Sequence, residues 1–188
     1  MRASARGLPP QALALGLFGS VQRARLLDLV QVASEACAAN GQDVRLLYVG
    51  PHGTHVREAI GTAVPVVDGG TLPPDEVSRW FAAMDVYLAP YIDGASTRRT
   101  SLMTGLQHGI ATVTTHGHAT DPMLAAENGR ALLLTDSPET FNVQVVRLAQ
   151  SCVLRDNIGR QARRLYEDHF AWERVANRLW HCFSEHYA

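Results

Sequence analysis

VYLAPYIDGASTRRTSLMTGLQHGIATVTT, residues 86–115, is the stretch that decides the fold. The apolar run Val86–Ala89 ends at a proline and predicts a buried strand. A polar turn follows, and then a helix from about Thr100 to His108 that stops at Gly109. Ala111–Thr115 predicts the next strand. A strand, a helix and a second strand in this order indicate a βαβ unit, whose two strands lie parallel in one sheet.

The same alternation runs through most of the chain. Further strands are predicted at 12–18, 44–49, 64–67 and 131–134, and further helices at 25–39, 54–60, 74–84, 121–127, 137–152, 156–169 and 172–187. The predicted fold class is therefore α/β, with a Rossmann-like parallel sheet and helices on both faces. Ligands of such folds bind at the carboxyl ends of the strands, so a site is expected in the turns that follow them.

Composition and charge narrow the class of protein. The chain has 188 residues, 46% hydrophobic and 19% charged, the balance of one soluble globular domain. A formal net charge of −1 gives no sign of a nucleic-acid partner. The three scattered cysteines, Cys37, Cys152 and Cys182, argue against a disulfide framework or a structural zinc site and favour a cytoplasmic setting. No apolar run approaches the ~20 residues needed to span a bilayer.

The turn before the helix concentrates groups that bind phosphate. A helix N-terminus presents free N–H groups and a partial positive charge, and a glycine lets the backbone approach a ligand closely. Arginines and hydroxyls add further donors. The turn therefore predicts a diphosphate cradle, although a capped helix with a solvated basic turn would explain the same residues. The residues concerned are Asp93, Gly94, Ser96, Thr97, Arg98, Arg99, Thr100 and Ser101.

This stretch resembles the donor-site signature of the retaining GT-B glycosyltransferases, the glycosyltransferase group 1 family. Asp93–Arg99 is similar to a bacterial variant of that signature, an Asp-Gly-Val-Ser-x-Arg-Arg turn, nearly residue for residue. Leu17-Phe18-Gly19 followed by Arg25 resembles the family's first strand and its basic phosphate contact. AAENGRALLL (125–134) and RQARRLYEDHFAWERVANRLWHCF (160–183) resemble its later segments. In order, the matches extend from about Ala12 to Tyr187.

The resemblance implies a function for the chain as one half of an enzyme. Residues 1–188 would form the donor-binding domain, with 171–188 as a C-terminal closing helix, and a second α/β domain, missing here, would bind the acceptor. The complete enzyme would transfer a sugar from a UDP- or GDP-linked donor with retention of configuration, without a metal ion or a separate cofactor. The chain alone would bind the donor without turnover. Peripheral membrane association of the complete enzyme is compatible with this resemblance.

The resemblance also assigns roles to individual residues. Asp93 is the candidate catalytic residue at the donor sugar, although an Asp-Gly turn in which it bonds its own backbone is the alternative. The family's two glutamates, eight positions apart, fall here on Ser96 and Thr104, which puts the ribose contact and the donor's identity in question. Arg25 is the first candidate for the basic residue that contacts the diphosphate, and Arg23 is the second. The candidate nucleotide-binding residues are Gly19, Arg25, Gly94, Arg98, Arg99, Thr100, Ser101 and Thr104.

Several other polar and aromatic residues have simpler explanations. The histidines His52, His55, His116 and His118 are interpreted as solvated or at the edge of the site rather than as metal ligands, and His108 as a helix-end residue. Asp121, which precedes a proline, is interpreted as a helix N-cap rather than a sugar contact, and Glu127 flanks the same short helix. The tryptophans Trp80, Trp172 and Trp180 are interpreted as core or domain-packing residues.

Two rival functions remain open at this point. The chain could be a non-catalytic nucleotide- or partner-binding module with a glycosyltransferase-like fold, which the two missing glutamates favour. A nucleotide-sugar epimerase shares the fold and is the weaker rival.

Overall fold

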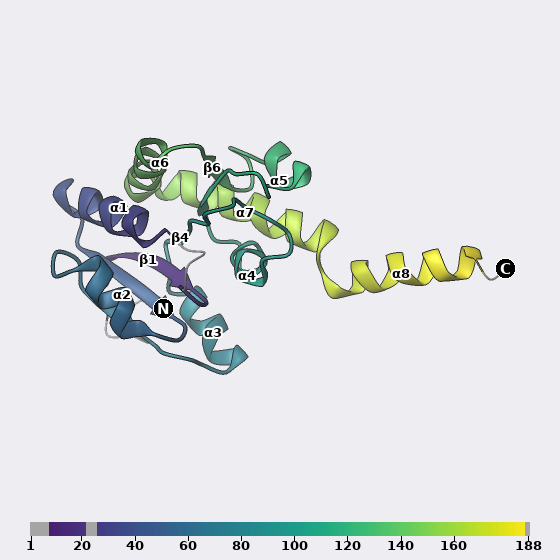
Figure 1. The fold of residues 1–188 in the computed structure, drawn as a ribbon, viewed down its shortest axis with the longest axis horizontal. Coiled ribbons are helices and arrows are strands. Elements are labelled where there is room, and N and C mark those ends of the chain that lie inside the picture. The colour runs from purple at the N-terminus through teal and green to yellow at the C-terminus, as the bar shows by residue number, and fades with distance from the viewer. Residues whose placement is uncertain (1–7, 22–25, 187–188) are drawn as a thin grey trace.

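A single parallel sheet organises the computed structural model, which describes residues 8–21 and 26–186 (Figure 1). Its strands are β1 (Leu13–Phe18), β2 (Val44–Val49), β3 (Val66–Asp68), β4 (Val86–Ala89), β5 (Thr112–Thr115) and β6 (Leu133–Thr135). Their order across the sheet is β3-β2-β1-β4-β5-β6, and every neighbouring pair is parallel. The predicted Rossmann-like α/β fold is therefore confirmed.

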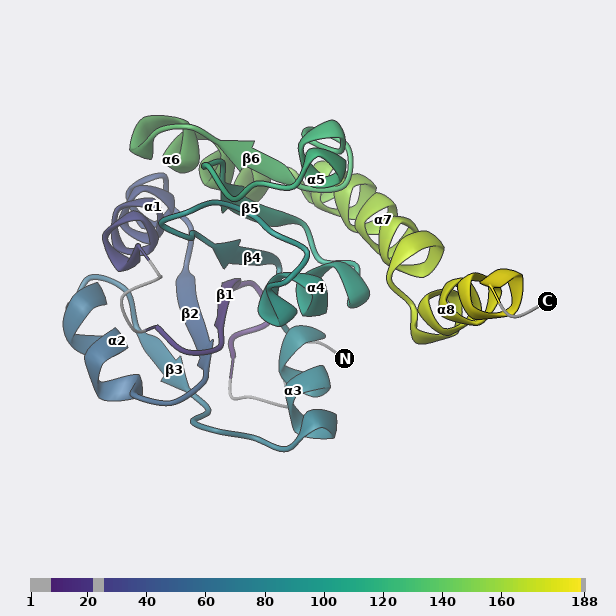
Figure 2. The ribbon, with the colours of Figure 1, turned by 45° about the vertical axis from the view of Figure 1, so that its right-hand side comes forward.

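Helices cover both faces of the sheet (Figure 2). They are α1 (Leu27–Ala39), α2 (Gly53–Ile60), α3 (Pro74–Phe81), α4 (Thr100–Gln107), α5 (Pro122–Ala126), α6 (Pro138–Gln150), α7 (Cys152–His169) and α8 (Trp172–His186). Buried residues of α1, α2 and α6 join one hydrophobic cluster, and those of α3, α4 and α5 join another; α7 contributes Ile158 to the first and Ala162 and Leu165 to the second. The sheet separates the two clusters, so both of its faces are withdrawn from water.

Burial on both faces explains why β1 and β4 are continuous apolar runs in the sequence. In β1, Leu15 and Leu17 enter one cluster and Ala14 enters the other, as the alternation of side chains along a strand requires. Gly16 has no side chain because the sulfur of Met84 occupies the space where a Cβ would stand. Strand and helix packing at the centre of the domain is thus specified by residue size as well as by hydrophobicity.

The largest difference from the predicted helix boundaries lies between α6 and α7. The helix predicted at 137–152 ends at Gln150, and the helix predicted from residue 156 starts at Cys152. Ser151 separates them because its backbone is extended (φ −133°, ψ 99°) and its side chain accepts a hydrogen bond from Leu154 N at 3.2 Å. A serine N-cap therefore starts the second helix four residues earlier than the apolar pattern indicated.

Helix α8 projects away from the body of the domain beyond α7 (Figure 1). Four of its large apolar side chains are exposed: Trp172, Leu179, Trp180 and Phe183. Trp80, in contrast, is buried as predicted. The core alternative is therefore wrong for Trp172 and Trp180, which are 75% and 72% exposed, and packing against another domain stays a prediction. Among the described helices, none is long and apolar enough to cross a bilayer.

The three thiols should differ sharply in reactivity. Cys37 is fully buried in α1, and burial raises the pKa of its thiol to about 11, whereas Cys152 and Cys182 are exposed. Because the thiolate is the reactive form, we expect dithionitrobenzoate to label two thiols quickly in the folded chain and the third only after unfolding. Cys37→Ala should leave both fast phases unchanged. Three equally fast thiols in the native protein would show that Cys37 does not lie in the core.

Candidate functional site

The centre of the sheet opens at the carboxyl ends of β1 and β4. β1 is paired with β2 along its whole length, but with β4 only at Leu15–Val86 and Gly16–Tyr87. The order in which strands are added to the sheet reverses at this pair. β2 and β3 are added on one side of β1, and β5 and β6 are added on the far side of β4. In open parallel sheets such a reversal leaves a crevice outside the strand ends, where ligands bind.

A cavity of about 550 Å³ lies on one side of this crevice. It is walled by the turns after β1, β2 and β3 and by helices α3 and α4. Its lining is apolar on several sides and carries hydroxyl, amide and imidazole groups but no carboxylate, lysine or arginine among the described residues. The lining residues are Phe18, Gly19, Val49, Gly50, Pro51, Thr71, Leu72, Pro74, Val77, Ser78, Thr104, Gln107 and His108. Two predicted nucleotide-binding residues, Gly19 and Thr104, therefore face the same space.

The turn after β1 is held in place by the neighbouring strand. Gly19 has a φ of +94°, a conformation that favours glycine. Its N–H donates to Val49 O at 2.9 Å, and the hydroxyl of Tyr48 donates to Gly19 O at 3.0 Å. The mouth of the cavity is thus fixed by a glycine turn and a buried tyrosine. Arg23 and Arg25, the predicted basic contacts of this turn, lie outside the described residues.

Backbone hydrogen bonds join the loop between β4 and α4 to the end of β5 and the loop after it. Ala95 N donates to Thr115 O at 3.0 Å, and Ala119 N donates to Asp93 O at 2.9 Å. Gly94 adopts a φ of +98°, and a Cβ there would lie 2.5 Å from Gly117 N. Glycine is required at position 94 by both its backbone conformation and this close approach, so the two loops form one unit.

Asp121 takes part in this unit in a way that corrects the sequence interpretation. It stands at the N-cap position of α5, but its side chain makes no capping hydrogen bond to that helix. Its carboxylate accepts a hydrogen bond from Thr97 N instead. That backbone bond, helped by hydroxyl hydrogen bonds from Thr97 and Ser96 and by the charge of Arg98, lowers the pKa of Asp121. Asp121 therefore restrains the β4–α4 loop rather than capping α5.

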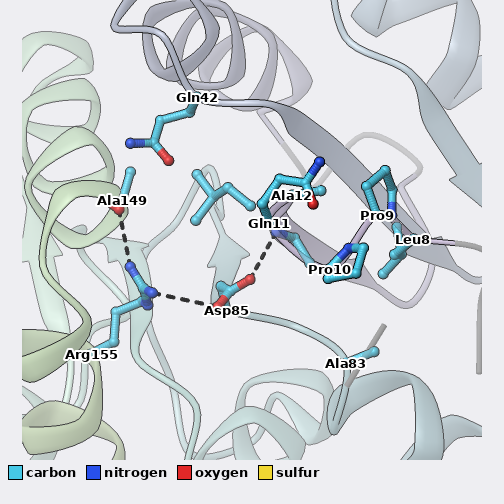
Figure 3. A pocket seen from close by; sticks show the side chains of 12 residues that line it. Leu8, Pro9, Pro10, Gln11, Ala12, Gln42, Ala83, Asp85, Ala149 and Arg155 are labelled. Atoms are coloured by element: carbon cyan, nitrogen blue, oxygen red, sulfur yellow. Dashed lines mark hydrogen bonds and ion pairs between the residues drawn. The ribbon is translucent and has the colours of Figure 1, made fainter. Parts of the chain in front are cut away.

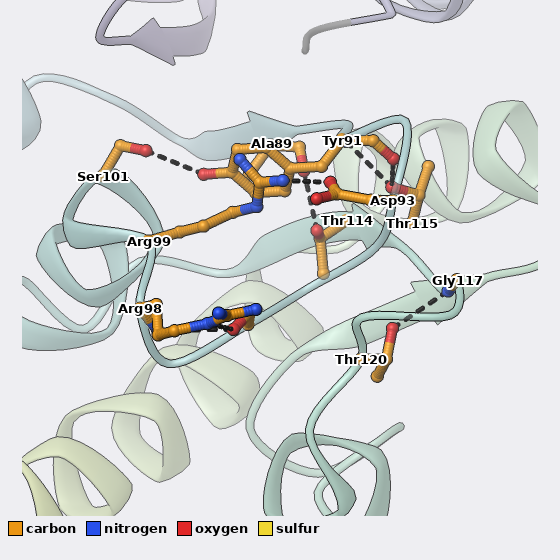
Figure 4. A network of polar contacts seen from close by, with 11 residues as sticks. Ala89, Tyr91, Asp93, Arg98, Arg99, Ser101, Thr114, Thr115, Gly117 and Thr120 are labelled. Carbon is orange, nitrogen blue, oxygen red and sulfur yellow. Dashed lines mark hydrogen bonds and ion pairs between the residues drawn. The ribbon is translucent and has the colours of Figure 1, made fainter.

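Arg99 lies at the centre of a second network in the same loop (Figure 4). Its guanidinium carbon stands 4.1 Å from the centroid of the Tyr91 ring, and the group forms an ion pair with Asp93. The hydroxyl of Tyr91 is hydrogen-bonded to Ser101 Oγ at 2.8 Å. Three residues predicted from one turn, Asp93, Arg99 and Ser101, are thereby brought together around the ring of Tyr91.

Arg98 and Thr100 complete the placement of the predicted residues. Both are exposed, and Arg98 Nε lies 3.5 Å from Ser96 Oγ. Arg99 is the N-cap residue of α4, and no side chain caps that helix. The N-terminus of α4 therefore lies beside two arginines without a side-chain cap, while Thr104, one turn further along the same helix, lines the cavity.

The histidines do not form a metal centre in the part of the chain that the structure describes. His52, His55, His116 and His118 are all exposed, and His116 Nδ1 lies 3.1 Å from the Asp136 carboxylate. No group of three histidine, cysteine or carboxylate side chains that could hold a metal ion occurs among the described residues.

His108 and Glu127 are held by neighbouring groups. His108 Nδ1 lies 2.9 Å from Thr104 O at the end of α4, as the helix-end interpretation predicted, and its ring stacks on Phe81. Glu127 forms an ion pair with Arg130. The contacts of His108 therefore account for its position, whereas the second carboxylate oxygen of Glu127 is buried without a hydrogen-bond partner among the described residues.

A smaller cavity of about 160 Å³ lies at the opposite ends of the strands (Figure 3). The two charged side chains that line it, Asp85 and Arg155, form an ion pair. Asp85 accepts a hydrogen bond from Ala14 N at 2.9 Å and lies 3.6 Å from Arg155, which donates to the carbonyls of Leu148 and Ala149 at 2.7 and 3.0 Å. These contacts tie α7 and the end of α6 to the sheet, so this cavity has a structural explanation.

Sequence reasoning missed the features that depend on residues far apart in the chain. It did not identify Tyr91 as the platform under Arg99, or Asp121 as the acceptor for Thr97 N, 24 positions away. The apolar walls of the cavity were assigned to strands and helices without a role. A tyrosine eight positions before an arginine in a glycine loop is the one local signal that could have suggested the stack.

The close contact at Gly94 gives a prediction about stability. Gly94→Ala should destabilise the fold by about 2–4 kcal/mol, because an alanine pays for the left-handed conformation and for overlap with Gly117. Gly41→Ala is the matched control, since Gly41 also has a positive φ (+82°) but open space around it. It should cost only about 1–2 kcal/mol. Urea unfolding of both variants measures the difference, and equal losses would contradict the loop contact.

Comparison with known proteins shows the family and the fold of the chain. Residues 9–151 match the sequence profile of the family described as Glycosyl transferases group 1. No curated protein sequence matches the chain. Among solved structures, the C-terminal domain of the glycosyl transferase group 1 family protein LpcC from Francisella tularensis superposes with a TM-score of 0.67 at 14% identity, covering 84% of this chain and 86% of that domain.

Two longer proteins share the fold over one part of their length. Sucrose-phosphate synthase from Thermosynechococcus elongatus gives a TM-score of 0.79 at 14% identity, and WaaG, a glycosyltransferase involved in lipopolysaccharide biosynthesis, gives 0.70 at 20%. They cover 99% and 90% of this chain, which spans 48% and 46% of theirs. The chain belongs to the glycosyl transferases group 1 family and has the fold of a C-terminal GT-B domain.

Proposed function

We propose that this chain is the donor-binding half of a glycosyltransferase and holds a nucleoside diphosphate sugar in the crevice between β1 and β4. The observation that carries the proposal is the position of α4. Its uncapped N-terminus adjoins Arg98 and Arg99, and Thr104, one turn later, lines the cavity. A turn of helix rises ~5.4 Å. A nucleotide whose base lies in the cavity can therefore place its phosphate groups at the N-terminus of the helix.

The chemistry of the two regions matches the parts of a nucleotide. The cavity has an apolar wall with Leu72 and Val77 and polar groups such as Gln107, which suits a flat, neutral base. The N-terminus of α4 and Arg98 suit the diphosphate, because backbone N–H groups and a guanidinium both bind phosphate oxygens. Arg25, which lies outside the described residues, is proposed to bind the same diphosphate. No metal ion is invoked, since these groups supply the positive charge.

The sugar would then lie beside Asp93, whose backbone and carboxylate are both restrained. A fixed carboxylate can accept hydrogen bonds from sugar hydroxyls and hold the anomeric carbon for attack. Cationic and N–H groups around the diphosphate stabilise the departing nucleotide. An acceptor-binding domain would close the crevice from the other side, with the exposed apolar side chains of α8 packed against it, and transfer would proceed with retention.

One observation favours a second candidate, a non-catalytic nucleotide- or partner-binding module. Ser96 and Thr104 stand where glutamates are usual in the resembling family, and Ser96 is only 2% exposed. A buried serine does not replace a carboxylate at a sugar. Turnover by this chain together with an acceptor-binding domain separates the two functions, because the module would bind nucleotide without transferring sugar.

The first test of the proposed function is ligand binding in the cavity. We expect UDP or GDP, or a sugar derivative of one of them, to raise the melting temperature of the chain, because a ligand that binds only the folded state stabilises it by mass action. Thr104→Trp should abolish this shift by filling the cavity. Gln150→Trp, an exposed position on α6, is the control and should leave it unchanged. Equal shifts in both variants would place the nucleotide elsewhere.

The second test separates the sugar from the diphosphate. Asp93→Asn should weaken binding of the nucleotide sugar by roughly 1–3 kcal/mol, the range for hydrogen bonds to a charged group. The bare nucleoside diphosphate should bind as before, because the carboxylate does not contact phosphate. Isothermal titration calorimetry with both ligands measures the difference. Equal losses for the two ligands would mean that Asp93 only shapes the turn.

A further inference from the structure

Arg99 and Arg98 are neighbours in sequence but occupy different surroundings. The side chain of Arg99 is 21% exposed, stacks on Tyr91 and pairs with Asp93. Arg98 is exposed, its Nε lies 3.5 Å from Ser96 Oγ, and its charge acts on the carboxylate of Asp121. If both arginines only bound a solvated diphosphate, Arg99 would not need an aromatic stack and an ion pair that Arg98 does without. The difference indicates that they have different roles.

The platform under Arg99 is rigid. Tyr91 is 2% exposed, its hydroxyl is fixed by Ser101, and its backbone N–H donates to Thr115 Oγ1 at 2.8 Å. A guanidinium that stacks on an aromatic face and binds a carboxylate is held in both its plane and its direction. Arg99 is therefore preorganised before any ligand arrives.

Asp93 is the group that gains from this arrangement. Its carbonyl accepts a hydrogen bond from Ala119 N, and the glycine after it locks the backbone against Gly117. The ion pair with Arg99 then fixes the remaining freedom, the rotation of the side chain. Its side chain is still 32% exposed, so a substrate hydroxyl can reach it.

We infer that Arg99 is a positioning residue that orients the carboxylate of Asp93 toward the donor sugar, while Arg98 and the N-terminus of α4 take the charge of the diphosphate. This inference rests on the proposed function. It predicts that Arg99 affects recognition of the sugar and not of the nucleotide. A phosphate-binding arginine would affect both ligands.

The test compares two ligand pairs, UDP with UDP-glucose and GDP with GDP-mannose, by isothermal titration calorimetry on the whole chain. Arg99→Lys keeps the charge but loses the planar fork and the stack. It should weaken the nucleotide sugar that the wild type binds by roughly tenfold or more and leave the corresponding nucleoside diphosphate within about twofold. Arg147→Lys, on the exposed side of α6, is the matched control and should change neither affinity.

Coupling to Asp93 distinguishes positioning from direct contact. In an Asp93→Asn background, Arg99→Lys should cause no further loss, because the carboxylate it orients is already gone. Arg99→Gln, which also removes the charge, gives a second route if the lysine variant is unstable, and should show the same loss confined to the sugar. Thermal unfolding of each variant confirms that it is folded.

Three outcomes would overturn the inference. Equal losses for the nucleotide and its sugar would make Arg99 a phosphate ligand, additive losses in the double variant would separate it from Asp93, and unchanged affinity for both ligands would leave it without a role in binding. A wild-type chain that binds none of the four ligands would instead contradict the proposed function itself.

Discussion

The order of the six parallel strands is the constraint on which the rest of the structure depends. The chain leaves β1 toward β2 on one side and leaves β4 toward β5 on the other. The turns after β1 and β4 therefore diverge at the carboxyl edge of the sheet. The short pairing of β1 with β4 leaves the ends of both strands apart. Everything assigned to the site follows from this opening: the glycine turn after β1, the loop after β4, and α4 between the cavity and the loop.

The loop after β4 holds its shape because a second loop supports it. Backbone hydrogen bonds join Ala95 to Thr115 and Ala119 to Asp93, and Gly94 lies against Gly117. The carboxylate of Asp121 adds a bond to Thr97 N. A loop that binds a charged ligand is thereby rigid before binding, which lowers the entropy cost of recognition. The same support explains how a polar, glycine-containing turn remains ordered at the edge of the sheet.

The sequence predicted the parts of this structure that short-range patterns determine. β2 and β4 lie where their apolar runs end in glycine or proline, and the start of α4 follows from its polar turn. The start of α7 was missed because Ser151 caps it. The cap at Asp121 was misassigned because its true partner, Thr97, lies in another loop, and no periodicity reports such a contact. The candidate site was therefore predictable as a set of residues, but not as a set of partners.

We propose that a nucleoside diphosphate binds at the carboxyl ends of β1 and β4. A crystal structure of the chain grown with UDP or GDP tests it most directly. We expect the base to lie in the cavity beside Leu72 and Thr104 and the diphosphate to lie within hydrogen-bond distance of the first turn of α4. A nucleotide at the opposite ends of the strands, beside Asp85 and Arg155, would contradict it.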